Sequence, residues 1–158
     1  MRSAWHHHHV RWSRRGHRPF PRHLSGNPGR HQLGGAITGS IQDGSDVNHG
    51  FVRAPDGNIT TFDVPGAGTG AFQGTIPANI NNPEAIDGSY IDASDVVHGF
   101  VRAPDGSITT FDAAGAGTGP GQGTFPQGIN DAGAITGYYI DNHDVLHGFL
   151  RTRTHRAR

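Results

Sequence analysis

The chain has 158 residues, 25 glycines, no cysteine, and 13 basic and 13 acidic side chains. This composition excludes a disulfide framework and a thiolate metal site, and the zero net charge favours neither nucleic acid nor a membrane as partner. No apolar run is long enough to span a membrane, so the composition fits one domain, or a piece of one, made of short strands and glycine-rich turns.

Residues 1–35 are rich in Arg, His, Pro and Gly and include His6 to His9. Three interpretations compete: a metal-binding histidine tract, a purification tag, or coding sequence read in the wrong frame. A one-base shift of degenerate codons for Trp5 to Arg11 permits Gly-Thr-Ile-Thr-Thr-Phe-Asp, which nearly matches residues 57–63. We therefore expect an out-of-frame, disordered segment with no signal peptide, because no apolar stretch follows its basic start.

From Ala36 onward the sequence repeats with a period of 49 residues. The segment His98 to Asp112 also occurs at His49 to Asp63 with one difference, and it begins again at His147. This spacing defines a first repeat at 36–84, a second at 85–133 and a partial third at 134–151, and about two-thirds of the positions aligned between the first two are identical. Residues 152–158 leave the pattern, and we predict a disordered tail there.

Each complete repeat contains four predicted strands, rich in Ile, Val, Thr and aromatic residues. In the second repeat they cover 85–92, 96–102, 107–112 and 123–130, and 134–141 begins the third repeat. Ala103-Pro104-Asp105-Gly106 predicts a tight hairpin turn, and Asp92 to Asp95 predicts a polar turn. Gly115 to Gly119 predicts a longer loop, and Pro126 makes the fourth strand the weakest prediction.

The predicted fold class is all-β. Four antiparallel strands in 40–50 residues are typical of a β-propeller blade, so we expect about two complete propeller-type blades and one partial blade. A solenoid of β-hairpins is the alternative. Blades without neighbours expose their faces and edges, and we therefore expect marginal stability and contact with neighbouring blades missing from this chain or self-association, whereas any other partner stays unknown.

Several spaced elements of the third repeat resemble a known family. Gly133 to Asp141 read Gly-Ala-Ile-Thr-Gly-Tyr-Tyr-Ile-Asp, and His147 to Arg151 read His-Gly-Phe-Leu-Arg. Together they resemble the HAF repeats of bacterial extracellular proteins, which are named for a His-Ala-Phe element. Glycine replaces that alanine in all three copies here, and the resemblance covers about 36–151. It implies a long, secreted, propeller-like parent protein without established activity, whereas this chain has few blades and no export signal.

His49, His98 and His147 recur once per repeat. A ring of metal ligands or acid–base groups is one interpretation. We favour hydrogen-bonded structural histidines, because catalytic groups need distinct roles whereas residues that maintain a fold recur. No serine lies in a nucleophile pattern, and we predict no catalytic residue and no cofactor.

The aspartate pairs of the polar turns, Asp43/Asp46, Asp92/Asp95 and Asp141/Asp144, allow a weak calcium site. Turn chemistry explains them equally well, so we predict no metal site. Gly66 to Gly70 is not a phosphate loop, because the chain has no lysine and a strand follows; we expect a flexible loop. Arg53, Arg102 and Arg151 are expected beside carboxylates or in solvent.

Three functions follow from these patterns. A non-enzymatic extracellular scaffold or binding module of unknown ligand, here a fragment of a longer propeller, is favoured by the resemblance. A pseudogene-like fragment without independent function is favoured by the reading-frame pattern. A propeller glycosidase or lyase is the third, and it would need acids or histidines outside the repeat pattern, of which the repeats show none.

Overall fold

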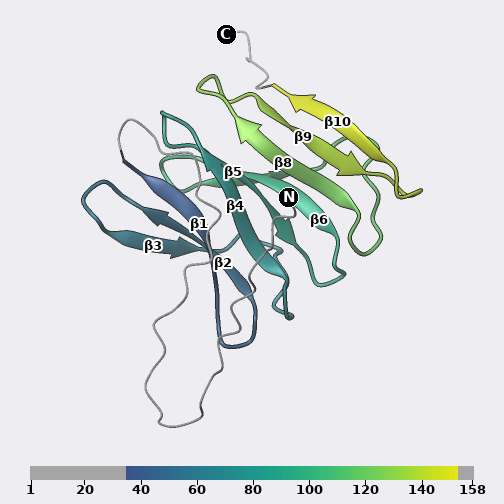
Figure 1. Ribbon diagram of the computed structural model, residues 1–158, viewed down its shortest axis with the longest axis horizontal. Coiled ribbons are helices and arrows are strands. Elements are labelled where there is room, and N and C mark those ends of the chain that lie inside the picture. Colours follow the sequence, from purple (N-terminus) through teal and green to yellow (C-terminus); the bar gives the residue numbers. More distant parts are fainter. Residues whose placement is uncertain (1–34, 153–158) are drawn as a thin grey trace, which may run out of the picture.

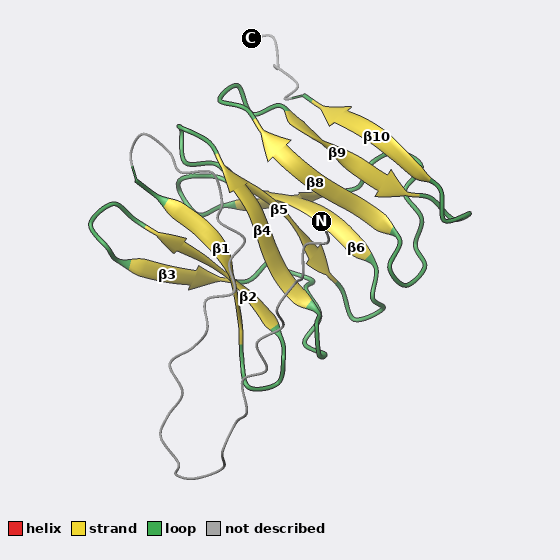
Figure 2. Ribbon diagram, in the orientation of Figure 1, coloured by secondary structure: helices red, strands yellow, loops and turns green. Residues whose placement is uncertain are grey.

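The protein is described by a computed structural model that covers residues 35–152, and these residues form ten strands and no helix (Figures 1 and 2). The all-β prediction is therefore confirmed for this part of the chain. The predictions for residues 1–34 and 153–158, including the histidine tract His6 to His9 and almost all of the predicted tail, lie outside the described residues.

Alternation of apolar and polar residues, bounded by turn sequences, sets the strand positions. The strands are β1 Ile37–Gln42, β2 Asn48–Arg53, β3 Ile59–Phe62, β4 Gly74–Ile80, β5 Ile86–Ile91, β6 Val97–Arg102, β7 Ile108–Phe111, β8 Gly123–Ile129, β9 Ile135–Ile140 and β10 Leu146–Arg151. In the second repeat, the predicted strands agree with β5 to β8 to within one residue at each end.

The strands pair as three antiparallel meanders, of which the second and third cross the repeat boundaries. The first meander is β1–β2–β3, the second is β4–β5–β6–β7 and the third is β8–β9–β10. The fourth strand of each sequence repeat therefore pairs with the first strand of the next repeat. The hairpins β4–β5 and β8–β9 each contain a register shift, at Pro77 and Pro126, where proline cannot donate to the ladder.

One parallel bridge joins each meander to the next and makes a single open mixed sheet (Figure 1). Asn48 on β2 pairs with Gly74 on β4, and Val97 on β6 pairs with Gly123 on β8. Gly74 and Gly123 have φ of 107° and 121°, and a Cβ there would collide with the backbone of the bridged residue. Glycine is therefore required at both junctions. The propeller arrangement of the meanders stays a prediction.

The predicted turns are present. In the hairpin between β6 and β7, the Gly106 N–H donates to the Ala103 carbonyl at 2.9 Å, and Gly106 has φ of 89°. The polar turn between β5 and β6 closes through the Asp95 N–H and the Asp92 carbonyl at 3.1 Å. These local bonds confirm that Pro-Asp-Gly and Asp-x-Ser-Asp sequences position the strands.

The core lies between successive meanders and is built from the same side chains each time. Phe100 and Ile86 are fully buried, and Phe62 of the first meander meets Phe100 edge-to-face at 6.1 Å between centroids. Phe111 of the second meander meets Phe149 of the third at the same distance. Such aromatic pairs stabilise by ~1 kcal/mol beyond their burial, so they strengthen the contact between successive meanders.

Within residues 35–152, Arg102 and Arg151 form no ion pair with an aspartate, contrary to one of the two expectations for them. The Arg102 guanidinium lies 5.0 Å from the centre of the Phe62 ring, and that of Arg151 lies 4.5 Å from the centre of the Phe111 ring. Both arginines end a strand that faces the previous meander, which brings them over its phenylalanine. A cation–π contact of this kind contributes ~1 kcal/mol.

Candidate functional site

The recurring histidines lie where the β1–β2, β5–β6 and β9–β10 turns meet the second strand of each hairpin. His98 is hydrogen-bonded through Nδ1 to Asp112 Oδ1 at 2.9 Å, and its Nε2 lies 3.5 Å from Asp92 Oδ2. His49 makes the same two contacts, with Asp63 and Asp43, at the same distances. Each of these two imidazoles therefore bridges the polar turn to the residue after the third strand.

The third histidine has one carboxylate partner instead of two. His147 Nε2 lies 2.9 Å from Asp141 Oδ2, and among the described residues Nδ1 has no hydrogen-bond partner. The side chain of His147 is 40% exposed, compared with 21% for His98. His98 and His147 also stack on Tyr90 and Tyr139, with centroids 4.9 and 4.8 Å apart.

The acids of the polar turns are occupied by the protein's own donors. Asp92 Oδ1 accepts the backbone N–H groups of Ser94 and Val96 at 2.8 and 2.9 Å. Asp95 Oδ1 accepts the side-chain amide of Gln73 at 2.8 Å, and Asp144 accepts that of Gln122 in the same way. These carboxylates close the polar turns and bind the glutamine that precedes β4 or β8. Among residues 35–152, no group of three acidic or histidine side chains could hold a metal ion.

The hydrogen bonds shift the pKa values of the cluster in opposite directions. The bond to Asp63, aided by its negative charge, raises the pKa of His49 against the opposing effect of burial. Backbone donors from Val47 and Ser45 lower the pKa of Asp43. Backbone donors and His147 together lower the pKa of Asp141 to about 2. The two carboxylates therefore stabilise the protonated form of the His49 imidazole relative to a free histidine.

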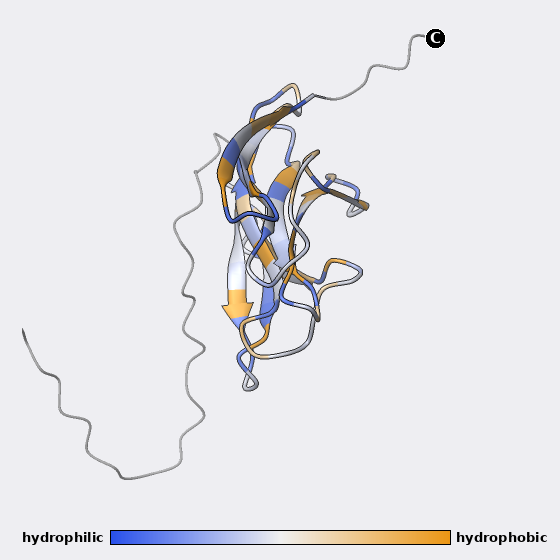
Figure 3. Cartoon of the chain, turned by 90° about the vertical axis from the view of Figure 1, so that its right-hand side faces the viewer, coloured by the Kyte–Doolittle hydropathy of each residue, from blue (hydrophilic) through white to orange (hydrophobic). Residues whose placement is uncertain are grey.

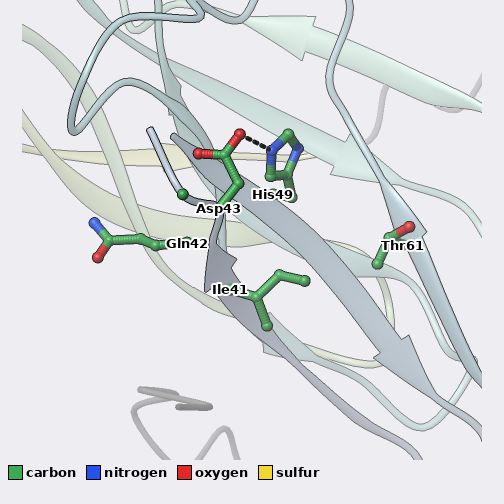
Figure 4. A pocket seen from close by; sticks show the side chains of 6 residues that line it. Ile41, Gln42, Asp43, His49 and Thr61 are labelled. Atoms are coloured by element: carbon green, nitrogen blue, oxygen red, sulfur yellow. Dashed lines mark hydrogen bonds and ion pairs between the residues drawn. The ribbon is translucent and has the colours of Figure 1, made fainter. Parts of the chain in front are cut away.

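A cavity of about 340 Å³ opens beside His49 (Figure 4). It is lined by Ile41, Gln42, Asp43, Gly44, His49 and Thr61. The equivalent surface of the second meander is covered by the loop at Gly66 to Gly70, whose Gly68 N–H donates to the Ile91 carbonyl at 2.8 Å. The loop is thus seated on β5, where a Cβ on Gly68 would lie 2.8 Å from the Asp92 backbone, so close packing accounts for this glycine.

Asp87 is a chemically unusual residue that the sequence pattern did not single out. It is fully buried on β5, and neither of its carboxylate oxygens has a hydrogen-bond partner. Burial raises its pKa to about 6, although its β4 neighbour Asn79 opposes the shift. The other repeats carry Thr38 and Thr136 at this position, and that difference was the available signal.

Comparison with known proteins adds no relative. No protein-family model matches the chain, and neither a curated protein nor a solved structure is similar to it. The resemblance to HAF repeats therefore stays a prediction. In residues 35–152 there is no helix with the length and apolar character needed to cross a membrane.

Proposed function

We propose that this protein is a non-enzymatic scaffold or binding module of extracellular type, made of propeller-type blades, as the resemblance to HAF repeats suggests. The observation that carries the proposal is the use of the Asp–His cluster. At His49 and His98 the same two carboxylates hold the imidazole at the same distances, 2.9 and 3.5 Å. A site that performs a reaction needs groups with different roles, whereas this cluster joins a turn to a strand each time it occurs.

The blade assignment draws support from the second meander. Its strands β4 to β7 form a four-stranded antiparallel meander, and one parallel bridge joins it to the third meander. Between meanders, contact is mainly through side chains such as Phe62 and Phe100. Blades of a propeller are likewise antiparallel sheets that pack face to face.

The test is to extend the chain by one repeat, with a copy of residues 103–151 placed after Arg151. A stacking scaffold gains stability with each added unit, because a new interface forms. Burying Leu146 and Leu150 alone is worth ~3 kcal/mol by area. Urea unfolding of the extended chain should therefore show one cooperative transition at a higher midpoint. A separate transition for the added repeat, with the original midpoint unchanged, would contradict the proposal.

A further inference from the structure

The outer edge of β10 differs from the corresponding edges of the other two hairpins. β2 pairs through Gly50–Arg53 with β3, and β6 pairs through Gly99–Arg102 with β7, in the same register. Within the described residues, β10 pairs only with β9, and it lies at the end of the row of strands (Figure 1). An unpaired edge offers backbone donors and acceptors to an extended peptide.

A space for one phenylalanine lies on this edge, at Gly148. The rings of Phe62 and Phe111 lie directly over Gly50 and Gly99, with ring atoms 2.8 and 2.7 Å from where a Cβ would be. At Gly148 the nearest atom to such a Cβ is the Gly137 carbonyl oxygen, 3.9 Å away. A cavity of about 450 Å³ opens there, and its lining includes Phe111, Tyr139, Gly148 and Phe149.

A place for one carboxylate lies next to it. The residue that follows the phenylalanine is aspartate in the first and second meanders, and it binds the histidine Nδ1 at 2.9 Å. His147 Nδ1 is the corresponding atom of the third meander, and it has no such partner in the described part of the chain. The space over Gly148 and the Nδ1 atom of His147 thus have the spacing of a phenylalanine and the aspartate that follows it on a strand.

The apolar surface around this edge also lacks the cover found elsewhere. Val96 and Val97 are each 5% exposed, whereas their counterparts Val145 and Leu146 are 48% and 63% exposed. Leu150 is 66% exposed, and apolar residues lie along the outer strand when the β10 side faces the viewer (Figure 3). In the second meander Val97 is bridged to Gly123, which follows β7 along the chain. A partner that continued past the Phe-Asp pair would therefore cover Leu146.

We infer that the edge of β10 is a peptide-binding site for an extended segment with the sequence Ile-Thr-Thr-Phe-Asp. The segment adds antiparallel to β10, its phenylalanine fills the cavity over Gly148, and its carboxylate accepts the His147 Nδ1–H. The partner is a polypeptide that presents this strand unpaired, since β3 and β7 of this chain are already paired. The inference rests on the proposed scaffold function, because it names the partner and the surface through which such a module assembles.

The test uses the full chain and a fluorescein-labelled peptide with the sequence of residues 106–113, Gly-Ser-Ile-Thr-Thr-Phe-Asp-Ala. Fluorescence anisotropy should show saturable binding with one peptide per chain. A peptide with Phe111→Ala should bind at least ~30-fold more weakly, because it loses the anchor side chain that would fill the cavity beside Tyr139 and Phe149. The wild-type protein should bind a peptide with Asp112→Asn more weakly than the unchanged peptide. A His147→Asn protein should bind the two peptides equally, and this difference isolates the carboxylate–imidazole contact.

In the protein variant Gly148→Val, the added Cβ has the Gly137 carbonyl oxygen at 3.9 Å as its nearest neighbour, and the two methyl groups are meant to occupy the space over Gly148 that the phenylalanine needs. The variant should keep the wild-type circular dichroism and unfolding midpoint yet bind the peptide at least ~10-fold more weakly. Gly44→Ala, in an exposed turn with open space around it, is the matched control and should bind as the wild type does. Equal binding by Gly148→Val, or by the Phe111→Ala peptide, would overturn the inference.

Absence of saturable binding to the folded wild type would also overturn it. If the chain extended by one repeat is nevertheless stabilised, the scaffold proposal survives, and only the inference that β10 binds a separate peptide fails. If the extended chain gains nothing either, both proposals fail together. Dimerisation of the chain without peptide, abolished by Gly148→Val, would show that a second copy donates the strand and would overturn the separate polypeptide as partner.

Discussion

Asp87 gives the sharpest stability prediction. It is fully buried, neither oxygen has a partner, and the first and third repeats carry threonine at its position. Thr38 shows what the position prefers, since its hydroxyl donates to the Phe51 carbonyl at 2.8 Å. An ionised carboxylate cannot donate, so at neutral pH Asp87 keeps a buried charge without the hydrogen bond that threonine makes.

The magnitude follows from the pKa. Burial raises the pKa of Asp87 from 3.8 to about 6 in the folded protein. The folded state therefore binds more protons than the unfolded state between these two values, and the free energy of unfolding falls as pH rises through that window. A pKa difference of this size corresponds to ~3 kcal/mol of the free energy of unfolding, and the protein has lost all of this stability above about pH 7. The direction is opposite to that of an exposed, paired aspartate.

Asp87→Thr should therefore raise the free energy of unfolding by up to ~3 kcal/mol at pH 7.5 and by much less near pH 4.5. Urea unfolding at pH 4.5, 6 and 7.5 measures the difference between variant and wild type, so other titrating groups cancel. Asp87→Asn is a second variant that removes the charge but keeps the shape. Thr136→Asp is the matched control, because Thr136 is exposed and a carboxylate there should change stability little at any pH.

The reasoning fails on a specific outcome. The free energies of unfolding of Asp87→Thr and the wild type could differ by the same amount at every pH between 4.5 and 7.5. In that case Asp87 is not, in solution, a buried carboxylate without a compensating partner. If Asp87→Thr is destabilised at every pH, the threonine hydroxyl has no acceptor at this site and the comparison with Thr38 does not hold.

Three further predictions use comparisons between the repeats. Gly99→Ala should lower the unfolding midpoint in urea, because a Cβ there meets the Phe111 ring at 2.7 Å, whereas Gly148→Ala should lower it little or raise it. Glu84→Gly should raise the free energy of unfolding by ~1 kcal/mol, since Glu84 has φ of 65° and the third meander has glycine there; a lower value would contradict the strain. The raised pKa of His49 gives the wild type a contribution to stability that is present below about pH 6.5 and is lost as pH rises through that pKa. His49→Gln should remove this contribution, and an unchanged pH dependence of thermal unfolding would refute the prediction.

Local chemistry made the strands and turns predictable. Pro-Asp-Gly and the Asp-x-Ser-Asp turn restrict a few neighbouring residues, and the runs of Ile, Thr and Phe between them have one favourable backbone state. The pairing of β4 with β5, across the repeat boundary, could not be predicted from these signals. Every repeat contains the same strands, and the sequence of a strand does not specify which copy it pairs with. The parallel bridges at Gly74 and Gly123 were hidden for the same reason.

The residues of the candidate site could be picked out from the sequence, but their geometry could not. Recurrence of the histidines indicated structural residues, and the paired contacts of His49 and His98 agree with that interpretation. Their distant partners Asp63 and Asp112 lie fourteen residues further on, and only the folded hairpin brings them close. Asp87 lies on β5, which has β4 and β6 as paired neighbours and also contacts β8, and these long-range contacts are encoded by no local pattern.

Repetition separates what maintains this fold from what makes one part of it different. Wherever all neighbours are present, the cluster around the histidine is closed: two carboxylates hold the ring, and a phenylalanine covers the glycine beside it. At His147 and Gly148 the same residues are open on one side, although their sequence is unchanged. Identical residues therefore differ in chemistry because their surroundings differ. Binding by this chain should accordingly be sought at the third meander, where the same side chains still have contacts to make, and not around His49 and His98, where those contacts are already satisfied.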